Sequence, residues 1–333
     1  MALKLTVATG PYDRVRAFHT GAVRMEGAEI RYVPVKSPPD LFTRMVRDGE
    51  FDAAEMSLGF YLPARAERQL PFVAIPVFPS RVFRHSFIFV NTRAGIATPK
   101  DLEGKRIGVR GYRQTAGVWI RGILRDEYGV SLDRVRWVEG GVNAPRKRET
   151  TLDIRPDGSG PSIEFAPDDR SLNDMLADGE IDALVGAELP HTLATSPNVA
   201  RLFPDYRAVE REYFTRTGLY PTMHTVVIRE ELHRRHPWIA ESLYKAFEEA
   251  KAWAHVQNRF MGALHYMLPW LSEQMEEIDR VFGGDPFPYG LEANRKPLET
   301  MMRYLVADGF LTRTVAIDDL FVPIIAQAHA ARR

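Results

Sequence analysis

Along this chain, short apolar runs typical of strands alternate with segments in which apolar residues have helical spacing. This alternation recurs in the same order in the two halves of the chain. Short apolar runs at residues 4–10 and 105–111 predict two strands. A second pair of strand-like runs follows at 30–33 and 135–138. Between the runs, apolar residues recur every three to four positions, which is typical of amphipathic helices. The pattern predicts a strand–helix–strand unit that occurs twice.

The third pair of matching segments is the clearest. Residues 42–53 and 172–183 share a methionine at the fourth position and later the run Asp-Gly-Glu, an apolar residue, Asp-Ala. The glycine follows the last apolar turn, where it would cap a helix. Three matches in one order favour an internal duplication over chance similarity of two βαβ units. Because strands alternate with helices, we predict an α/β protein with mainly parallel strands and right-handed crossovers.

Segments outside the duplication complete this picture. Residues 142–170 are rich in proline, glycine and charge, and they predict a hairpin or a long loop. A further strand is expected at 223–228, followed by amphipathic helices that include 237–256 and 295–306. Two such sheets would place six strand-to-helix turns at strand carboxyl ends, where open α/β sheets bind ligands.

Composition narrows the classes of function. A length of 333 residues exceeds what one hydrophobic core usually serves, so we expect two domains. The 44 basic residues balance the 44 acidic ones, which gives no support for a nucleic-acid or membrane partner. The absence of cysteine excludes disulfides and thiolate chemistry. Strand-like residues begin almost at once, with no leader-like stretch before them, so we expect a cytoplasmic protein.

Five segments of the chain carry a resemblance to a known family. They are 51–58 (FDAAEMSL), 76–86 (PVFPSRVFRHS), 115–122 (TAGVWIRG), 220–224 (YPTMH) and 289–295 (YGLEANR). With these segments, the order of the elements resembles that of type II periplasmic solute-binding proteins, and within them the branch that includes 4,5-dihydroxyphthalate decarboxylase. The likeness extends from about residue 4 to about residue 310. The resemblance implies two lobes, each a mainly parallel sheet flanked by helices, with a ligand-binding cleft between them.

The same resemblance implies how the chain divides. In the family the second lobe is inserted into the first, and two crossing strands form the hinge. Here the hinge strands would be residues 87–91 and 225–229. The first lobe would then comprise residues 1–91 and 225–333, and the second lobe residues 92–224.

The resemblance also implies an activity, the cofactor-independent decarboxylation of a hydroxylated aromatic acid. With 4,5-dihydroxyphthalate the products would be 3,4-dihydroxybenzoate and carbon dioxide. Such a carboxy-lyase needs cations for two carboxylates, an acceptor near the catechol and an acid with a pKa near neutrality. The expected partner is therefore a small aromatic carboxylate, and self-association into a homo-oligomer stays open.

Two arginines and a histidine stand together after the predicted strand 73–77. Arg81 and Arg84 offer planar forks of donors that suit two carboxylates. His85 offers an imidazole, whose ordinary pKa of about 6.5 suits proton transfer near neutral pH. Because 36 of the basic residues are arginines, a structural role for either arginine is the alternative.

Glu55 departs from its counterpart in the repeat. It follows the apolar run 51–54, where the matching residue of the second copy is Val185. A carboxylate in place of an apolar residue at a strand end predicts a base or a catechol acceptor, and burial would raise its pKa. The alternative is a structural carboxylate at a helix N-terminus or beside an arginine.

The positions of the histidines select the candidate acids. His85 and His224 flank the expected hinge strands, so either could deliver the proton, with a structural role as the alternative for each. No two histidines have the H-x-x-x-H or H-x-H spacing of a metal site, so neither a metal nor a cofactor is predicted. The predicted turns supply the substrate-binding candidates Tyr12, Arg14, His19, Ser57, Tyr112 and Thr115.

Three functional hypotheses follow from the sequence. The first is a decarboxylase of 4,5-dihydroxyphthalate or a related acid. The second is a non-catalytic solute-binding protein for a small carboxylate, of the kind that serves ABC transporters. The third is another enzyme on this scaffold, such as those that make the pyrimidine of thiamine with a histidine and iron, although no matching motif is present. Nucleotide-binding and serine-hydrolase motifs are also absent.

Overall fold

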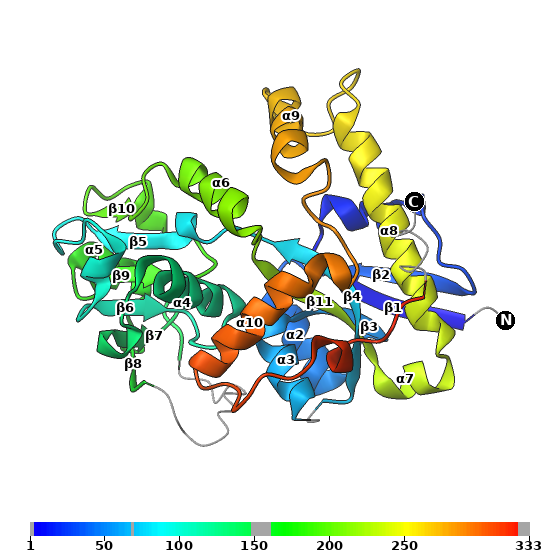
Figure 1. Ribbon diagram of the computed structural model, residues 1–333, viewed down its shortest axis with the longest axis horizontal. Helices are drawn as coiled ribbons and strands as arrows, with labels where there is room; N and C mark the ends of the chain where they lie inside the picture. The colour runs from blue at the N-terminus through cyan, green and yellow to red at the C-terminus, as the bar shows by residue number, and fades with distance from the viewer. Residues whose placement is uncertain (1–2, 68–69, 148–160, 326–333) are drawn as a thin grey trace. The chain divides into compact units, whose positions relative to one another are not determined.

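A computed structural model describes residues 3–67, 70–147 and 161–325 of the chain (Figure 1). The chain forms two compact units. Unit 1 comprises residues 1–81, 222–298 and 315–333, and unit 2 comprises residues 82–221 and 299–314. The sequence placed the boundaries at 92 and 225, and it assigned residues 299–314 to the first lobe rather than to the second.

Unit 1 is built on a five-stranded sheet with the order β2-β1-β3-β11-β4. Its strands are β1 (Leu3–Thr9), β2 (Ala28–Pro34), β3 (Ala53–Ser57), β4 (Phe72–Arg81) and β11 (Thr222–Arg229). Strand β1 pairs in parallel with β2 and β3. Strand β11 is antiparallel to both of its neighbours, β3 and β4. The strand expected at 223–228 is therefore confirmed, and it lies in the middle of the sheet.

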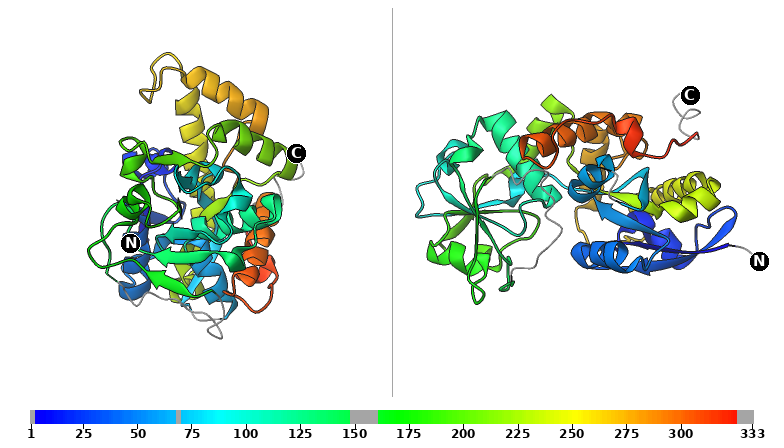
Figure 2. Two further views of the ribbon diagram at one scale, coloured as in Figure 1. Left: turned by 90° about the vertical axis from the view of Figure 1, so that its left-hand side faces the viewer. Right: turned by 90° about the horizontal axis from the view of Figure 1, so that it is seen from below.

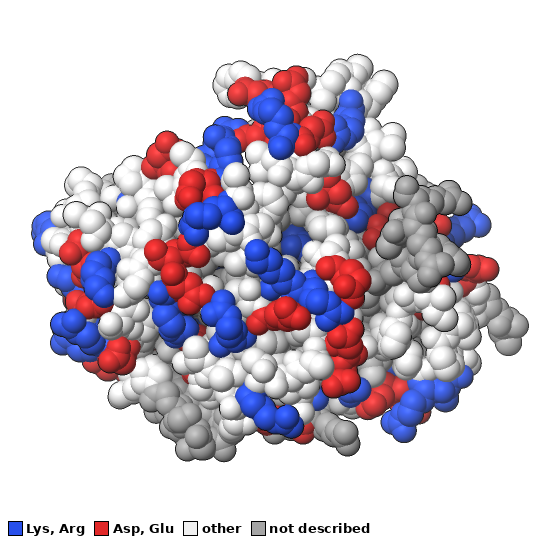
Figure 3. Space-filling model, viewed as in Figure 1, with Lys and Arg blue, Asp and Glu red and all other residues white. Residues whose placement is uncertain are grey.

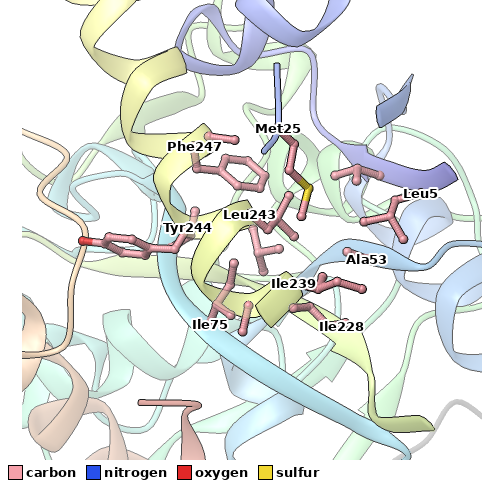
Figure 4. Packing of buried hydrophobic residues seen from close by; sticks show 14 of the residues in the cluster. Leu5, Met25, Ala53, Ile75, Ile228, Ile239, Leu243, Tyr244 and Phe247 are labelled. Atoms are coloured by element: carbon pink, nitrogen blue, oxygen red, sulfur yellow. The ribbon is translucent and has the colours of Figure 1, made fainter. Parts of the chain in front are cut away.

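Five helices flank the sheet of unit 1 in the described part of the chain. They are α1 (Arg16–Thr20), α2 (Pro38–Thr43), α3 (Leu58–Ala66), α7 (Glu230–Arg235) and α8 (Trp238–Arg259). A further helix, α9 (Leu271–Phe282), lies beside the far end of α8, away from the strands (Figure 1). The long helix α8 buries Ile239, Leu243 and Phe247 at the three-to-four spacing that keeps them on one face. This face packs on Ile75 and Ile228 of the sheet (Figure 4).

Unit 2 has a six-stranded sheet with the order β10-β5-β9-β6-β7-β8. Its strands are β5 (Ile88–Asn91), β6 (Arg106–Val109), β7 (Arg136–Glu139), β8 (Ile163–Phe165), β9 (Ala183–Val185) and β10 (Val199–Arg201). Its helices include α4 (Thr115–Tyr128), α5 (Leu172–Asp178) and α6 (Tyr206–Thr217). Helix α10 (Arg295–Ala307) begins in unit 1 and continues in unit 2. Figure 2 shows helices against both faces of each sheet.

The internal duplication is confirmed by sheet order. In unit 1, β1 lies between β2 and β3, and in unit 2 the matching strand β6 lies between β7 and β9. The helical turns before the third strands end at Gly49 and Gly179, both with positive φ (57° and 84°), as expected of C-cap glycines. The segment 142–170 contains strand β8, which sequence analysis missed, and its residues 148–160 lie outside the described part.

The fold class is confirmed, since both units are sheets of mostly parallel strands with flanking helices. Within the described ranges, no helix combines the length and the apolar character that crossing a membrane requires.

Candidate functional site

Glu55 is the centre of a hydrogen-bonded cluster in unit 1. It is the third residue of β3 and is fully buried. Its Oε2 accepts the Gly10 backbone N–H at 2.8 Å, and its Oε1 accepts the Tyr12 hydroxyl at 2.7 Å. Nδ1 of His224 lies 2.5 Å from the same Oε1. Two groups from the turn after β1 and one from β11 therefore converge on one carboxylate.

The sheet register explains why Glu55 and His224 meet. Glu55 lies opposite Val226 in the antiparallel β3–β11 pair, and His224 lies opposite Ser57. His224 is thus the diagonal neighbour of Glu55 on one face of the sheet, a separation that long side chains bridge. The predicted substrate-binding residue Ser57 lies beside His224 by the same register.

Electrostatics keep the carboxyl group of Glu55 ionised. Burial acts to raise its pKa, but the hydrogen bond and charge of His224, followed by the hydrogen bonds from Gly10 and Tyr12, outweigh burial and lower the pKa. An ionised carboxylate only accepts hydrogen bonds, so Nδ1 of His224 carries a proton. The sequence predicted a raised pKa for a buried Glu55, and this was wrong because three donors outweigh burial.

The Tyr12 hydroxyl also stays protonated. Burial, and then the charge of Glu55, raise the pKa of Tyr12 far above its ordinary value. Tyr32 supports the same turn, because its hydroxyl donates to the Gly10 carbonyl at 3.0 Å and lies 2.9 Å from Thr9 Oγ1. Burial raises the pKa of Tyr32 to about 12. Two tyrosines thus hold the end of β1 against Glu55.

Glycine is required at position 10 by the closeness of Tyr12. A Cβ atom there would lie 2.6 Å from Cζ of the Tyr12 ring, well inside van der Waals contact. Gly111 occupies the matching position in the repeat, and a Cβ atom there would meet no atom of the described residues within 4 Å. The tight approach is therefore specific to the turn that carries the cluster.

Arg14 places a cation beside the cluster. Its guanidinium lies over the Tyr12 ring, 4.1 Å from the centroid, and over the Phe287 ring at 4.2 Å. Its Nε donates to the Pro79 carbonyl at 2.6 Å, and one terminal nitrogen pairs with Asp13 at 3.1 Å. These contacts fix the guanidinium in one orientation.

Tyr12 and Arg14 also line a cavity of about 440 Å³ within unit 1. The other walls come from the turn after β1, from α8 and α9, and from the residues before and after α9. They are Asp13, Lys251, Ala254, His255, Asn258, Arg259, Tyr266, Leu268, Leu271, Gln274, Met275, Ile278, Pro286 and Phe287. A cavity of this size accommodates a small aromatic acid. Tyr12 connects the two features, because its ring lines the cavity and its hydroxyl reaches Glu55.

Arg81 has structural partners in unit 1. It is buried at the end of β4, and its guanidinium donates to the side-chain oxygen of Asn294 and, at 3.3 Å, to the Pro288 carbonyl. Arg81 therefore holds the segment before α10 against the sheet, which supports the structural alternative for this residue. His19 lies exposed on α1 and is not part of the Glu55 cluster.

His85 lies in the interior of unit 2, and it is not suited to the predicted role of proton donor. The rings of Tyr128, Phe203 and Tyr213 surround it at centroid distances of 6.1, 5.4 and 5.1 Å. Neither ring nitrogen makes a hydrogen bond with the described residues. Burial lowers the pKa of His85 to about 4, so the ring is neutral at pH 7. We correct its role to a structural one.

Three other candidates lie in unit 2. Arg84 is buried, its Nη1 lies 3.4 Å from the Gly186 carbonyl, and burial lowers its pKa to about 9. Tyr112 is buried, with the guanidinium of Arg121 3.8 Å from its ring centroid, so it belongs to the packing of this unit. Thr115 is the buried first residue of α4.

Sequence reasoning found Tyr12, Arg14, Glu55 and His224, and the structure brings these four residues together. It missed Gly10, Tyr32 and Phe287. The repeat could have drawn attention to Gly10, since this glycine ends the first predicted strand. Its counterpart Gly111, however, has no close contact with the described residues of the kind that Gly10 makes with Tyr12. Among the described residues, no group of three or more histidines, aspartates or glutamates is arranged to hold a metal ion.

Comparison with known proteins gives two curated relatives. Over 322 residues the chain is 37% identical to a 4,5-dihydroxyphthalate decarboxylase of Comamonas testosteroni, which covers 96% of this chain and 97% of that protein. A protein of the same name from Pseudomonas putida is 35% identical over 213 residues, covering 64% of this chain and 81% of that protein. No family model matches the chain.

Solved structures share the fold at low sequence identity. A putative sulfonate-binding protein from Methylobacillus flagellatus has a TM-score of 0.57 at 14% identity and covers 99% of this chain and 95% of its own. The aliphatic sulphonate binding protein of Escherichia coli has a TM-score of 0.55 at 13% identity, with 96% and 98% covered. The desulfurization enzyme DSZB has a TM-score of 0.53 at 18% identity, with 99% of both chains covered. These likenesses show the type II periplasmic-binding-protein fold.

Proposed function

This chain belongs to the 4,5-dihydroxyphthalate decarboxylase family, and from this premise we propose that it converts 4,5-dihydroxyphthalate to 3,4-dihydroxybenzoate and carbon dioxide. One observation carries the proposal: the 37% identity to a curated decarboxylase extends over 96% of this chain and 97% of that protein. The Glu55 cluster supplies side chains that suit the chemistry.

The reaction requires a proton at one ring carbon. In 4,5-dihydroxyphthalate each carboxylate has a hydroxyl para to it, and the oxygen lone pairs push electron density toward the carbon that bears the carboxylate. A proton bonds to that carbon, the carbon–carbon bond to the carboxylate then breaks, and its electron pair restores the aromatic ring as carbon dioxide leaves. A positioned acid accelerates such a step by about 10²- to 10⁴-fold.

His224 is the proton donor in this proposal. Oε1 of Glu55 accepts a hydrogen bond from the Nδ1–H of His224, which leaves Nε2 of the imidazole to transfer a proton to the ring carbon. The charge of Glu55 stabilises the imidazolium before transfer, and solvent returns the proton afterwards. The side chain of His224 is 14% exposed, whereas that of Glu55 is fully buried. The sequence hypothesis that Glu55 contacts the catechol is replaced here by a positioning role.

Arg14 is the residue proposed to bind a substrate carboxylate in unit 1. Its guanidinium is held between two aromatic rings, and it faces a cavity that also contains Lys251. A planar fork of donors suits a carboxylate, and stacking on Tyr12 keeps the fork beside the cluster. The binding of the second carboxylate by Arg84 stays a prediction.

Turnover of the purified chain tests the proposal. Carbon dioxide release and the ultraviolet change are measured with 4,5-dihydroxyphthalate and with a panel of hydroxybenzoates and phthalates. We expect turnover with 4,5-dihydroxyphthalate and none with phthalate, which lacks the para hydroxyls. Thermal stabilisation by these acids without any carbon dioxide release would overturn the proposal in favour of a binding protein, because a ligand of the folded state raises Tm without chemistry.

The cytoplasmic location and a role in the breakdown of aromatic acids are also proposals. The chemistry supports the second, since decarboxylation of the phthalate gives a simpler catechol acid. Cell fractionation against marker enzymes of the cytoplasm and periplasm tests the location, and recovery with the periplasmic markers would contradict it.

A further inference from the structure

A lysine interrupts the buried face of α8. Lys251 lies among Phe247, Ala250 and Ala254, which are buried at the three-to-four spacing of an inward-facing helix stripe. Lys251 itself is only 6% exposed. A lysine is almost never buried to this extent unless its charge is paired. Its ammonium group therefore requires partners, and most of them come from the segment that follows α9.

Three acceptors surround the ammonium group of Lys251. Its Nζ lies 2.8 Å from Oδ2 of Asp285 and 3.1 Å from the Phe287 carbonyl oxygen. It also lies 3.1 Å from Oε2 of Glu248, one turn earlier on α8. An ammonium group has three donors and no acceptor, so these three acceptors use all of its donors. Lys251 lines the cavity, but none of its donors is left to bind a ligand.

Lys251 and Asp285 hold both backbone polar groups of Phe287. Oδ1 of Asp285 accepts the Phe287 N–H at 2.8 Å, and Nζ of Lys251 donates to the Phe287 carbonyl. Nε2 of His255 lies 3.4 Å from the same Oδ1. Burial acts to raise the pKa of Asp285, but His255 and Lys251 outweigh burial and lower the pKa. An ionised Asp285 therefore fixes the backbone of Phe287 from one side and Lys251 fixes it from the other.

The ring of Phe287 is one of the two rings that hold Arg14. The guanidinium carbon of Arg14 lies 4.2 Å from the Phe287 centroid and 4.1 Å from that of Tyr12. Of its five N–H groups, one donates to the Pro79 carbonyl and one to Asp13. Among the described residues, no contact uses the other three. Both rings set the direction in which these three donors point, so a displaced Phe287 would re-aim them.

The surface charges indicate that the orientation of single cations matters for binding an acid. On the face shown in Figure 3, basic and acidic side chains lie interspersed rather than in one basic patch. The chain as a whole has 44 basic and 44 acidic residues. A carboxylate is therefore attracted by individual oriented donors more than by a general positive field. Arg14 is such a donor, and its aim depends on Phe287.

We propose that Lys251 and Asp285 are positioning residues that determine the affinity for aromatic carboxylates, because together they hold the Phe287 ring against Arg14. The inference rests on the proposed function in one respect, the binding of a substrate carboxylate by Arg14. Stability alone gives little reason for a lysine on this face of α8, since buried ion pairs can often be replaced by apolar residues without loss. The geometry of Phe287 supplies the reason.

Phthalate binding by the full chain, measured by isothermal titration calorimetry, tests the inference without turnover. We expect Asp285→Ala to raise the Kd of phthalate roughly 10- to 100-fold, the range for one charge-assisted hydrogen bond. The KM for 4,5-dihydroxyphthalate should rise by a similar factor, with little change in kcat. Asp285→Asn keeps an oxygen for the Phe287 N–H, so its effect should be smaller. If Lys251 itself bound the carboxylate, Asp285→Ala would free the ammonium group and lower the Kd instead.

A double-mutant cycle shows whether Asp285 acts through the ring of Phe287. The variant D285A/F287L should bind phthalate no more weakly than the weaker of the two single variants. The control Asp52→Ala removes another aspartate of unit 1 that accepts a backbone N–H, from Thr6, and pairs with an arginine, Arg229. Asp52 does not line the cavity, so this variant should lose stability without a change in the Kd.

The inference is overturned by a phthalate Kd that Asp285→Ala leaves unchanged or lowers. It is also overturned by additive effects in the cycle, by an equal rise in Asp52→Ala, or by a wild type that binds no phthalate. A wild type without turnover, in which Asp285→Ala still weakens phthalate binding, contradicts the proposed function and leaves the positioning role standing. Circular dichroism checks the folding of each variant. If Asp285→Ala does not fold, Asp285→Asn and Lys251→Met give the same comparison.

Discussion

At Glu55, three hydrogen bonds hold one fully buried carboxylate. The Gly10 N–H and the Tyr12 hydroxyl donate two of them, and the partly exposed His224 makes the third. In the proposed reaction this arrangement fixes the proton on Nδ1 and stabilises positive charge on the imidazole. The proposal therefore has Glu55 act through His224 rather than on the substrate.

Replacement of Glu55 by glutamine tests this positioning role. The amide keeps the shape, but it cannot stabilise an imidazolium or fix the Nδ1–H tautomer. We expect Glu55→Gln to lower kcat about 10²- to 10⁴-fold with little change in KM. The control is Glu139→Gln, which alters a buried carboxylate of unit 2 that accepts the Tyr112 N–H. Equal kcat values for the wild type and Glu55→Gln would show that His224 does not need this partner.

His85 gives a prediction about pH and stability. Its folded pKa of about 4 lies below the ordinary value of 6.5, because burial among aromatic rings disfavours the charged form. Between pH 6.5 and 4 the unfolded chain therefore binds more protons than the folded chain, so the free energy of unfolding falls as pH falls through this window. We expect His85→Phe to remove part of this pH dependence and to keep turnover.

Urea unfolding at several pH values measures the effect of His85→Phe. The difference in free energy of unfolding between variant and wild type should change progressively from pH 6.5 to 4 and be constant above pH 7.5. A variant that folds but has lost turnover would restore His85 as a candidate acid and contradict its structural role.

At the scale of elements, the turn after β1 combines features that both copies of the repeat share with contacts that only the Glu55 cluster has. The sequence predicted the strands and the C-cap glycines of both copies, because period and capping chemistry are local. It could not predict that Gly10 is packed by Tyr12 whereas Gly111 faces open space, since this depends on side chains brought together by the fold. The position of Glu55 opposite Val226 likewise depends on the register with β11, which is more than 160 residues away in sequence.

Alanine at the two glycines distinguishes the two turns. In Gly10→Ala the Cβ atom would lie 2.6 Å from the Tyr12 ring, so Tyr12 must move away from Glu55. Overpacking of this kind costs about 1–3 kcal/mol of stability, and we expect kcat to fall as well. Gly111→Ala, its counterpart in the repeat, should leave both quantities near wild type. Steady-state kinetics and thermal unfolding of the two variants measure the contrast, and equal effects would contradict it.

At the scale of the whole molecule, the sequence predicted the order of elements better than the division of the chain. The second unit takes residues 299–314 from the C-terminal part, whereas the sequence assigned them to the first lobe. The reason lies in packing that no local pattern encodes. Tyr304 of α10 lies where a Cβ at Gly122 of α4 would be, and Asp308 pairs with the buried Arg121 at 2.7 Å. A glycine and an arginine on α4 are weak signals until their partners are known.

The pair Arg121–Asp308 offers a test of whether residues 299–314 belong to unit 2, through the free energy of unfolding of a variant. Both side chains are almost fully buried, and Arg125 donates a further hydrogen bond to Asp308. Removing one member of a buried pair leaves an uncompensated charge, which typically costs about 3–5 kcal/mol. We therefore expect Asp308→Asn to lower the free energy of unfolding by about that amount, as measured by urea unfolding.

The control for Asp308→Asn comes from the same part of the chain. Arg303 of α10 pairs with Asp126 of α4 at 2.9 Å, but its side chain is 58% exposed, so water already screens the charges. Exposed pairs of this kind contribute about 0.2–1 kcal/mol, and Arg303→Gln should cost no more than this. Two ion pairs that join α4 to residues 303–308 thus predict very different losses of stability, because burial decides how much of the charge is left uncompensated. If Asp308→Asn costs as little as Arg303→Gln, then residues 299–314 do not complete the core of unit 2.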